Sequence, residues 1–365
     1  MAQDVANSLV LAGHEVDVLC SGQTYAEASA SSESTNSVRV RIVPTGLGGS
    51  RLVHWIGFWL QAMRVVPFGQ WDRCILMTDP PFMLSLTVLC RLFGRRSRRM
   101  FWWTMDLYPE AMIASGMIRS RGVATRLLRF INNVGLKYLS GVIALGPTQR
   151  ELLVHYSNFD TSSRFCIVVP PWDFRSLQRV HRAENRFLNK YGWQDRKIAL
   201  YAGNLGEAHS FESLLAAARL FTDRNDTEWL FVFVIRGSKA LALQHAASSI
   251  ENVVVLDYQP VELTADLLSA ATVHVVTMAQ GWDGIVVPSK LYGIVATEKP
   301  VLFIGPRNAD TAIEIEEFGL GACVSSDVGA DEVVVAIEQL ATHSLERTKI
   351  FPTNGPQKIA NFITA

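Results

Sequence analysis

The sequence predicts an α/β protein built of two Rossmann-like, doubly wound domains that face each other across a cleft. The chain of 365 residues is too long for one ordinary core and suits two. Short apolar runs alternate with helical patterns along most of it, which is typical of parallel sheets covered by helices on both faces. The pattern breaks at Pro170 and Pro171. We therefore expect domains at residues 1–170 and 171–340, followed by a C-terminal tail at 341–365.

The first domain starts with a helical pattern at residues 2–12, and its first strand candidate, Glu15–Cys20, comes only after Gly13. A Rossmann unit ordinarily starts with a strand followed by a glycine turn. We therefore expect the first strand of this domain to be missing. The further strand candidates are Val38–Val43, Arg73–Met77, Met100–Thr104, Gly141–Leu145 and Arg164–Val169.

The second domain repeats the alternation of strands and helices without repeating the sequence. In such sheets ligands bind beyond the carboxyl ends of the strands, near the point where the strand order reverses. The chemistry is therefore expected close to the ends of these runs. They are Ile198–Ala202, Leu230–Ile235, Val253–Leu256, Val273–Val276, Pro300–Ile304 and Ala322–Val324.

Charge is divided unevenly between the two halves. Residues 1–170 contain 17 Lys plus Arg against 11 Asp plus Glu, and the rest of the chain contains 17 against 23. This split argues against a general nucleic-acid binder and favours an anionic partner for the first domain, either a membrane surface or a phosphorylated acceptor. Scattered solvated arginines are the alternative interpretation.

The cysteines and the apolar runs indicate in which cellular compartment the protein is expected. The five cysteines are odd in number and widely spaced, with no paired motif for zinc or a disulfide framework, so we expect a reduced, cytosolic protein. Neither a secretory signal nor a run of about 20 apolar residues is present. Peripheral association with the inner face of a membrane is a further expectation.

Two segments are candidates for that association. Leu52–Phe68 has the spacing of an amphipathic helix that carries Trp55, and a helix packed on its own domain core is the alternative. The second segment is a basic run beside aromatic residues, which suits anionic lipid headgroups. In its alternative interpretation the arginines are solvated and the aromatics are strand core. The run consists of Arg95, Arg96, Arg98 and Arg99, followed by Phe101, Trp102 and Trp103.

A glycine turn follows the first strand of the second domain. The segment runs from Tyr201 to Gly206 and leads into an apolar-periodic helix, with Ser210 as the expected N-cap. Glycines at such a turn allow backbone N–H groups to approach a ligand, and the positive end of the helix favours a diphosphate. A glycine turn is common in α/β domains, so taken alone the signal is weak.

A second segment, Gly281–Lys290, places a lysine beside the opening turn of a helix. A cation at the start of a helix opposes the helix dipole. A lysine with a purely structural role at this position would therefore destabilise the helix. A lysine there adds a full positive charge for the departing diphosphate of a nucleotide sugar. Lys290 is therefore the candidate that neutralises the leaving group.

Together these segments resemble the retaining glycosyltransferase family 4 group, which has the GT-B fold, and particularly its bacterial branch that builds exopolysaccharide, capsule and O-antigen. The fragments that carry the resemblance occur in family order in both domains. They are "AGHEVDVLCS", "TDPPF", "DLYPE", "AGNLGEAHSFESLL", "DYQPVELTADLLSAATVHVVTM" and "GWDGIVVPSKLYGIVA".

The resemblance implies that the second domain binds a UDP- or GDP-sugar donor and that the first binds a saccharide acceptor linked to a lipid. Lys290 and Asp106 would be the catalytic residues, with Asp106 orienting or deprotonating the acceptor; a helix N-cap is the alternative for Asp106. The implied donor-binding residues are Gly203, Asn204, Gly206, His209, Arg236, Tyr258, Gln259, Asp283, Gly284, Pro288, Ser289 and Lys290.

The sequence departs from the family at the donor site. Glu207, Ala208 and His209 stand where an arginine is usual, and Ile285 and Gly293 stand where two glutamates are usual. A catalytically silent GT-B protein is therefore a second hypothesis, and a nucleotide-sugar epimerase is a third. No Asp-x-Asp signature is present, so we expect no metal and no cofactor besides the nucleotide-sugar substrate.

Overall fold

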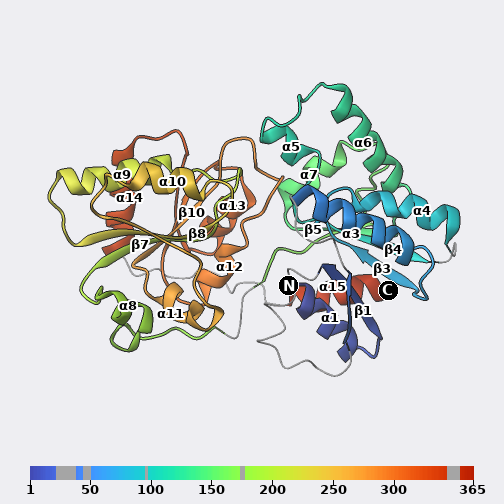
Figure 1. Ribbon diagram of the computed structural model, residues 1–365, viewed down its shortest axis with the longest axis horizontal. Helices are drawn as coiled ribbons and strands as arrows, with labels where there is room; N and C mark the ends of the chain where they lie inside the picture. Colours follow the sequence, from blue (N-terminus) through green and yellow to red (C-terminus); the bar gives the residue numbers. More distant parts are fainter. Residues whose placement is uncertain (22–37, 44–50, 95–97, 173–176, 343–353) are drawn as a thin grey trace. The chain divides into compact units, whose positions relative to one another are not determined.

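The computed structural model describes residues 1–21, 38–43, 51–94, 98–172, 177–342 and 354–365. The chain divides into two compact units. Unit 1 comprises Met1–Pro171 together with Asn354–Ala365, and unit 2 comprises Trp172–Thr353. Every strand candidate of the sequence forms a strand, and all strand pairs are parallel, so the predicted α/β class is confirmed (Figure 1).

Unit 2 contains one six-stranded sheet in the order β12-β11-β10-β7-β8-β9. Counted along this unit, the order is 6-5-4-1-2-3, the usual order of a doubly wound fold, and it reverses between β7 and β10. The ligand site predicted by such a topology lies at the carboxyl ends of these two neighbours. The strands are β7 (Lys197–Asn204), β8 (Trp229–Arg236), β9 (Val253–Leu256), β10 (Val273–Thr277), β11 (Val301–Ile304) and β12 (Gly321–Val324).

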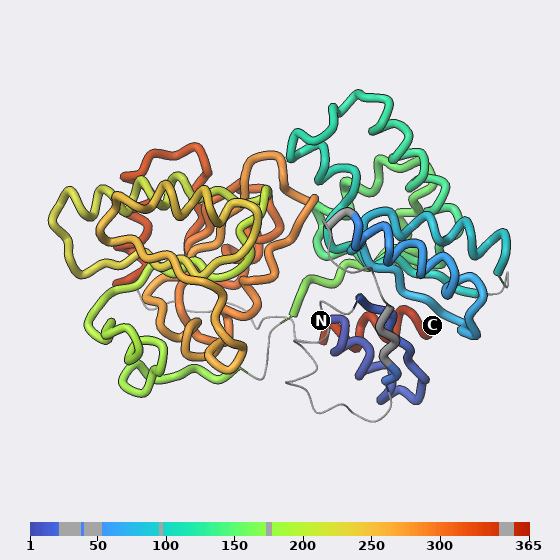
Figure 2. Tube along the Cα trace, in the orientation of Figure 1, coloured from blue at the N-terminus to red at the C-terminus, as the bar shows by residue number. Residues whose placement is uncertain are grey.

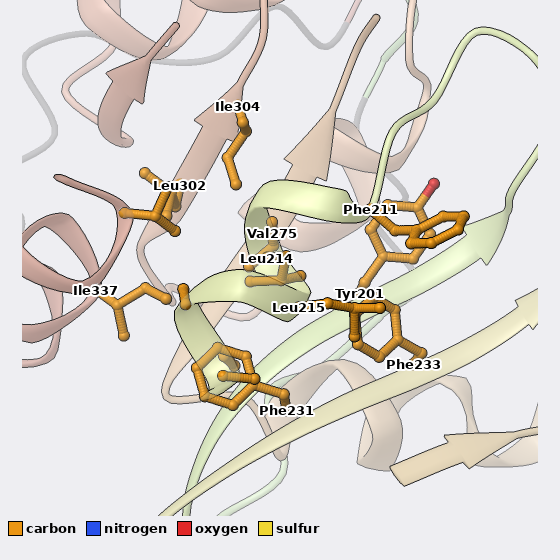
Figure 3. Close-up of a cluster of buried hydrophobic side chains, with 14 of the residues drawn as sticks. Tyr201, Phe211, Leu214, Leu215, Phe231, Phe233, Val275, Leu302, Ile304 and Ile337 are labelled. Atoms are coloured by element: carbon orange, nitrogen blue, oxygen red, sulfur yellow. The ribbon is translucent and has the colours of Figure 1, made fainter. Parts of the chain in front are cut away.

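Side chains alternate between the two faces of this sheet because successive residues of a strand point in opposite directions. Tyr201 and Phe233 lie in a core on one face (Figure 3). Leu200 and Val232 lie in a second core on the other face. Helices therefore close both faces. They are α8 (Arg186–Tyr191), α9 (Glu212–Asp223), α10 (Ala240–Ala247), α11 (Thr264–Ser269), α12 (Lys290–Val295), α13 (Asp310–Glu317) and α14 (Ala330–Thr342).

Unit 1 contains two parallel sheets where a single one was expected. β1 (Val16–Ser21) pairs with β2 (Val38–Val43), and β3 (Arg73–Leu76), β4 (Arg99–Trp103), β5 (Gly141–Ala144) and β6 (Cys166–Val168) form a four-stranded sheet in chain order. In the doubly wound strand order, the first strand of the chain lies between the second and the fourth and pairs with both. No described strand of unit 1 takes that position, which is why the pair stays separate.

The remaining helices of unit 1 include one from each end of the chain. The last helix, α15 (Gly355–Thr364), packs beside α1 (Ala2–Leu11), and Figure 2 shows the two ends of the trace side by side. α15 also contacts the four-stranded sheet, because the rings of Phe362 and Phe101 meet edge to face at 5.6 Å and Arg73 donates to the carbonyl of Thr364. The other helices are α3 (Arg51–Val65), α4 (Leu86–Phe93), α5 (Glu110–Ala114), α6 (Val123–Leu136) and α7 (Pro147–Val154).

Most of the aromatic residues proposed for lipid contact are buried in unit 1, and Trp55 is half-buried. Trp55 of α3 donates to Oδ1 of Asp79, and the three aromatics of β4, Phe101, Trp102 and Trp103, are buried. Arg98 donates to backbone carbonyls and stacks on Trp71, while Arg95 and Arg96 lie outside the described residues. The strand-core interpretation of the aromatics therefore applies. None of the helices described is both long and apolar enough to cross a bilayer.

Candidate functional site

The predicted glycine turn lies at the carboxyl end of β7, beside the point where the strand order of unit 2 reverses. Gly203 has a φ of 135°, which favours glycine. Its open side faces a lysine, because a Cβ at this position would lie 3.2 Å from Cε of Lys290. The fold therefore brings Gly203 and Lys290 together, although 86 residues separate them in the sequence.

The turn after β7 is held by the turn after β8. The N–H of Leu205 donates to the carbonyl of Arg236 at 2.7 Å, and Nζ of Lys239 donates to the carbonyl of His209 at 2.8 Å. Gly237, with a φ of 127°, allows this approach, since a Cβ there would lie only 2.5 Å from the carbonyl oxygen of Leu205. Lys239 thus holds the loop that ends at His209.

Lys290 starts α12, and its ammonium is buried. Nζ lies 3.6 Å from the centroid of the Tyr201 ring, and no described residue accepts a hydrogen bond from it. A desolvated cation–π contact contributes about 2 kcal/mol, whereas burying an unpaired charge costs considerably more. Burial accordingly lowers the pKa of Lys290 well below its usual value. An anion at the adjacent glycine turn would offset that cost.

His209 lies next to this lysine as an uncharged ring. Its Nδ1 lies 2.6 Å from the carbonyl oxygen of Thr277, at the end of β10. Burial, followed by the nearby Lys290, lowers the pKa of the imidazole to about 3. His209 is therefore neutral near pH 7, with Nδ1 as the donor. It cannot replace the positive charge of the arginine that the family usually places in this stretch.

Two residues of the predicted set form an exposed pair at the neighbouring strand ends. The guanidinium of Arg236, which ends β8, lies 4.5 Å from the centroid of the Tyr258 ring, just beyond β9. Tyr258 is 56% exposed. A flat cation stacked on an accessible ring presents a surface on which a planar group can stack.

The loop between β10 and α12 carries the remaining predicted residues. Oδ2 of Asp283 accepts a hydrogen bond of 3.1 Å from Asn308, and Gly284 and Pro288 are buried. Ser289 precedes α12 without a side-chain capping bond. Gln259 donates to the carbonyl of Asp257, and Asn204 and Gly206 belong to the turn described above.

One predicted cap is wrong. Phe211, rather than Ser210, is the N-cap residue of α9, and the side chain of Glu212 accepts from the backbone N–H of Phe211 at 2.9 Å. The carboxylate of the first helical residue thus accepts from the N–H of the N-cap residue before it.

Asp106 lies in unit 1, in the loop after β4, and is described within that unit alone. The hydroxyl of Thr78 accepts from the backbone N–H of Asp106 at 3.0 Å, and Gln149 donates to the carbonyl of Met105. The loop is thereby fixed at the carboxyl edge of the sheet with an exposed aspartate on it. Pro109 is the N-cap residue of α5, so the alternative interpretation of Asp106 as that helix's cap is wrong.

Sequence reasoning missed Tyr201 and Thr277. Tyr201 supplies the ring under Lys290 and donates to the carbonyl of Asn204 at 3.2 Å, and the carbonyl of Thr277 fixes the tautomer of His209. The only signal for Tyr201 was its place two residues before Gly203, on the same side of the strand.

In the described part of the chain, no group of His, Cys, Asp and Glu gathers that could hold a metal ion.

No protein-family model matches the chain. Two bacterial proteins are similar in sequence. WbjE of Pseudomonas aeruginosa, named as a glycosyltransferase, is 24% identical over 230 residues, which is 60% of this chain and 55% of WbjE. WcaI of Escherichia coli K12, named as a glycosyl transferase of colanic acid biosynthesis, is 28% identical over 276 residues, 73% of this chain and 66% of WcaI. The matches thus span about 55–66% of the length of these relatives.

Two solved structures share the fold of this chain. The chain aligns with WaaG, a glycosyltransferase of lipopolysaccharide biosynthesis, at a TM-score of 0.70 and 14% identity, over 100% of this chain and 95% of WaaG. It aligns with Anabaena HepE, solved with UDP and glucose, at a TM-score of 0.65 and 13% identity, over 99% and 90% of the two chains. The chain therefore has the GT-B fold. Both sequence relatives are named for glycosyl transfer, and the name of WcaI also gives colanic acid biosynthesis.

Proposed function

We propose that this GT-B chain is a glycosyltransferase that takes a sugar from a nucleotide-sugar donor held by unit 2 and passes it to a saccharide acceptor held by unit 1. The ammonium of Lys290 carries the proposal. It is buried without a hydrogen-bond acceptor among the described residues and lies against the glycine turn at the reversal point of the sheet. A buried cation without a hydrogen-bond acceptor, beside a glycine turn, is suited to bind a diphosphate.

In the proposed reaction the bond between the anomeric carbon and the diphosphate oxygen breaks, and its electron pair leaves with the diphosphate. The acceptor hydroxyl forms the new bond to the anomeric carbon and gives up its proton. Lys290 stabilises the departing negative charge, a contribution worth about 10²-fold or more in rate for one such donor. Because His209 is neutral, Lys290 is the group of this cluster that would carry the positive charge once a diphosphate is bound.

Asp106 is the residue of unit 1 that we assign to the acceptor. Its carboxylate is exposed on a loop fixed by Thr78 and Gln149, which limits the positions from which it accepts the hydroxyl proton. The excess of basic residues in 1–170 suits an anionic acceptor, and the names of the relatives support a lipid-linked saccharide of a surface polysaccharide. The motifs resemble a retaining family, so we propose retention of the anomeric configuration.

Calorimetric titration with UDP, GDP and their common sugar conjugates tests the donor site. We expect one nucleotide family to bind wild type and to lose at least ten-fold in affinity in Lys290→Met. UDP is the first probe, because the similar HepE structure holds it. Lys190→Met is the matched control, since Lys190 also lies over a tyrosine ring of unit 2, at 5.0 Å, but is exposed.

The outcomes separate the hypotheses. Binding without transfer to any lipid-linked saccharide would support a catalytically silent protein. Conversion of the nucleotide sugar without an acceptor would support an epimerase. Equal affinity in wild type and Lys290→Met would overturn the assignment of the site. For an active protein, NMR of the anomeric proton of the product would establish the stereochemistry.

A further inference from the structure

Three aromatic side chains of unit 1 meet at the carboxyl edge of its four-stranded sheet. Trp55 belongs to α3, Phe82 to the loop after β3, and Tyr108 to the loop after β4. The centroid of the Tyr108 ring lies 6.3 Å from that of Trp55 and 6.2 Å from that of Phe82, and both contacts are edge to face. All three residues, named here the aromatic cluster, are half-buried.

The two rings that meet at Tyr108 and Trp55 are fixed from different parts of unit 1. The indole N–H of Trp55 donates to Oδ1 of Asp79 at 2.9 Å. The carbonyl of Tyr108 accepts a hydrogen bond of 2.6 Å from Nδ2 of Asn132, which is buried in α6. Rings that are already fixed lose little conformational freedom when a ligand packs on them. The aromatic cluster is therefore preorganised.

Phe82 has a backbone conformation that a bulky residue rarely adopts. Its φ of 64° and ψ of 17° lie in the left-handed region. Its carbonyl accepts from the N–H and from the hydroxyl of Ser85, at 3.0 and 2.7 Å, and the indole of Trp59 donates to that hydroxyl at 3.0 Å. Backbone strain of this kind concentrates at binding and catalytic sites, where the surrounding contacts offset its cost.

Two exposed carboxylates accompany the aromatic cluster. Asp79 lies in the loop of Phe82, and Asp106 lies in the loop of Tyr108. The two loops are joined, because the hydroxyl of Thr78 accepts from the backbone N–H of Asp106 at 3.0 Å. A carboxylate has lone pairs on both oxygens, so Asp79 can accept from a ligand while it holds the indole. This edge of the sheet thus offers apolar rings together with acceptors of hydrogen bonds.

We propose that the aromatic cluster and Asp79 bind one sugar ring of the acceptor, and that this ring is neutral or carries an amino group. A pyranose has a face of C–H groups, which packs on aromatic rings, and a rim of hydroxyls, which donate to carboxylates. A uronic acid, or the phosphates of a nucleotide, would place like charges together. The inference rests on the proposed function and states which class of saccharide unit 1 accepts.

The test follows the indole N–H of Trp55 in the full chain by ¹H–¹⁵N NMR, with the signal identified by its loss in Trp55→Phe. The probes are the methyl glycosides of glucose, glucosamine and glucuronic acid. We expect the first two to shift the signal saturably at millimolar concentrations, and the glucuronide to bind about five-fold more weakly. Asp79→Asn, which keeps an oxygen for the indole and loses the charge, should reduce this difference to about two-fold.

Saturation-transfer NMR measures the affinity of the variants. Trp55→Leu and Tyr108→Leu should each weaken binding of methyl glucoside about five-fold, whereas Tyr108→Phe, which keeps the ring, should bind as wild type does. Trp71→Leu is the matched control. Trp71 is a half-buried tryptophan of unit 1 whose indole donates to the carbonyl of Val66, but it lies before β3, at the opposite end of that strand. This variant should keep the affinity of wild type.

Four results would overturn the inference. They are a Trp55 signal that none of the three glycosides shifts, equal affinity for the glucoside and the glucuronide, equal affinity of Trp55→Leu and Trp71→Leu for the glucoside, and a Trp55 signal that responds to UDP instead. If the leucine variants do not fold, Asp79→Asn still tests the site with all three rings in place.

Nucleotide titration of the same proteins separates this inference from the proposed function. A chain that binds a nucleotide through Lys290 and no sugar at Trp55 would contradict the inference alone. A chain that binds sugars at Trp55 and no nucleotide would contradict the proposed transferase and leave a saccharide site in unit 1.

Discussion

The phenol of Tyr292 donates a hydrogen bond of 2.6 Å to Oε2 of Glu314, which ties α12 to α13 two residues beyond Lys290. Burial, more than any other cause, raises the pKa of Glu314 to about 7, and the charge of Asp310 acts in the same direction, while the bond from Tyr292 opposes them. The carboxyl group that anchors the helix of Lys290 therefore titrates near neutral pH.

This titration makes stability depend on pH. The folded chain keeps the proton of Glu314 up to about pH 7, whereas the unfolded chain releases it near the ordinary value for glutamate, so the stabilisation is complete at low pH and is lost as pH rises towards 7. We expect the free energy of unfolding to fall by roughly 2–3 kcal/mol between pH 5 and pH 8 from this group. Urea denaturation of wild type and Glu314→Gln should give a flatter pH profile in the variant. Parallel profiles would contradict the prediction.

Replacing Lys290 by methionine should stabilise the protein. The change removes a buried ammonium without a hydrogen-bond acceptor among the described residues and keeps an apolar chain on the Tyr201 ring. We expect a gain of about 1–3 kcal/mol in the free energy of unfolding, with loss of nucleotide binding. The exposed control Lys190→Met should change stability by less than about 0.5 kcal/mol. A destabilised Lys290→Met would mean that the ammonium is already compensated.

Nucleotide binding should be accompanied by proton uptake. Burial lowers the pKa of Lys290 in the unbound protein, and a bound diphosphate would raise it again, so protons are taken up at a pH between the two values. Calorimetry at pH 8 in buffers of different ionisation enthalpy should give different apparent enthalpies for wild type. A dependence of the same size in a Lys290 variant that still binds at high nucleotide concentration would assign the proton to another group.

Gly237→Ala should disrupt the paired turns. A Cβ would lie 2.5 Å from the carbonyl oxygen of Leu205 and 2.7 Å from Oδ1 of Asn204, at a φ of 127°. We expect a loss of at least about 2 kcal/mol in stability, because backbone strain adds to overlap, and weaker nucleotide binding. The control is Gly329→Ala, where an added Cβ meets nothing within 4 Å. Similar unfolding midpoints for the two variants would refute the argument.

Tyr258→Ala should weaken nucleotide binding while sparing pyrophosphate. Tyr258 and Arg236 form the exposed stacked pair at the strand ends, where a nucleobase would lie flat on the ring. We expect a five- to ten-fold loss in affinity for the nucleotide, corresponding to about 1 kcal/mol of aromatic stacking, and little loss in Tyr258→Phe. Competition titrations with the nucleotide and with pyrophosphate distinguish a base contact from a general effect on the site.

The strands were predictable because each is a short apolar run between turn residues. From β3 to β12 the sequence also implied parallel pairing, since helical patterns separate the strands. The division of unit 1 into two sheets was harder to foresee, because strand patterns carry no information about which edges meet. In the described part of unit 1, β1 pairs with β2 and with no other strand.

The directions of side chains were harder to predict from the sequence than the positions of helices and strands. The spacing of α3 placed Trp55 on an apolar helix, but its hydrogen-bond partner, Asp79, lies in another segment. Thr125 and Asn132 of α6 are buried, although composition alone marks such residues as solvent-facing. The ring of Tyr201 beneath Lys290 could not be inferred either, because that contact joins strand β7 to the start of helix α12, which are distant in the chain.

Unit 1 is made of the first 171 residues and the last 12 described ones, with unit 2 between them. During synthesis the helix α15 leaves the ribosome after everything it contacts, including α1 and the ring of Phe101. Unit 2 is continuous in sequence and has its own cores. It can therefore fold before α15, the last helix of unit 1, has been synthesised. Newly made unit 1 therefore spends the whole translation time of unit 2 with part of its sheet uncovered, which is the interval in which chaperones would act on it.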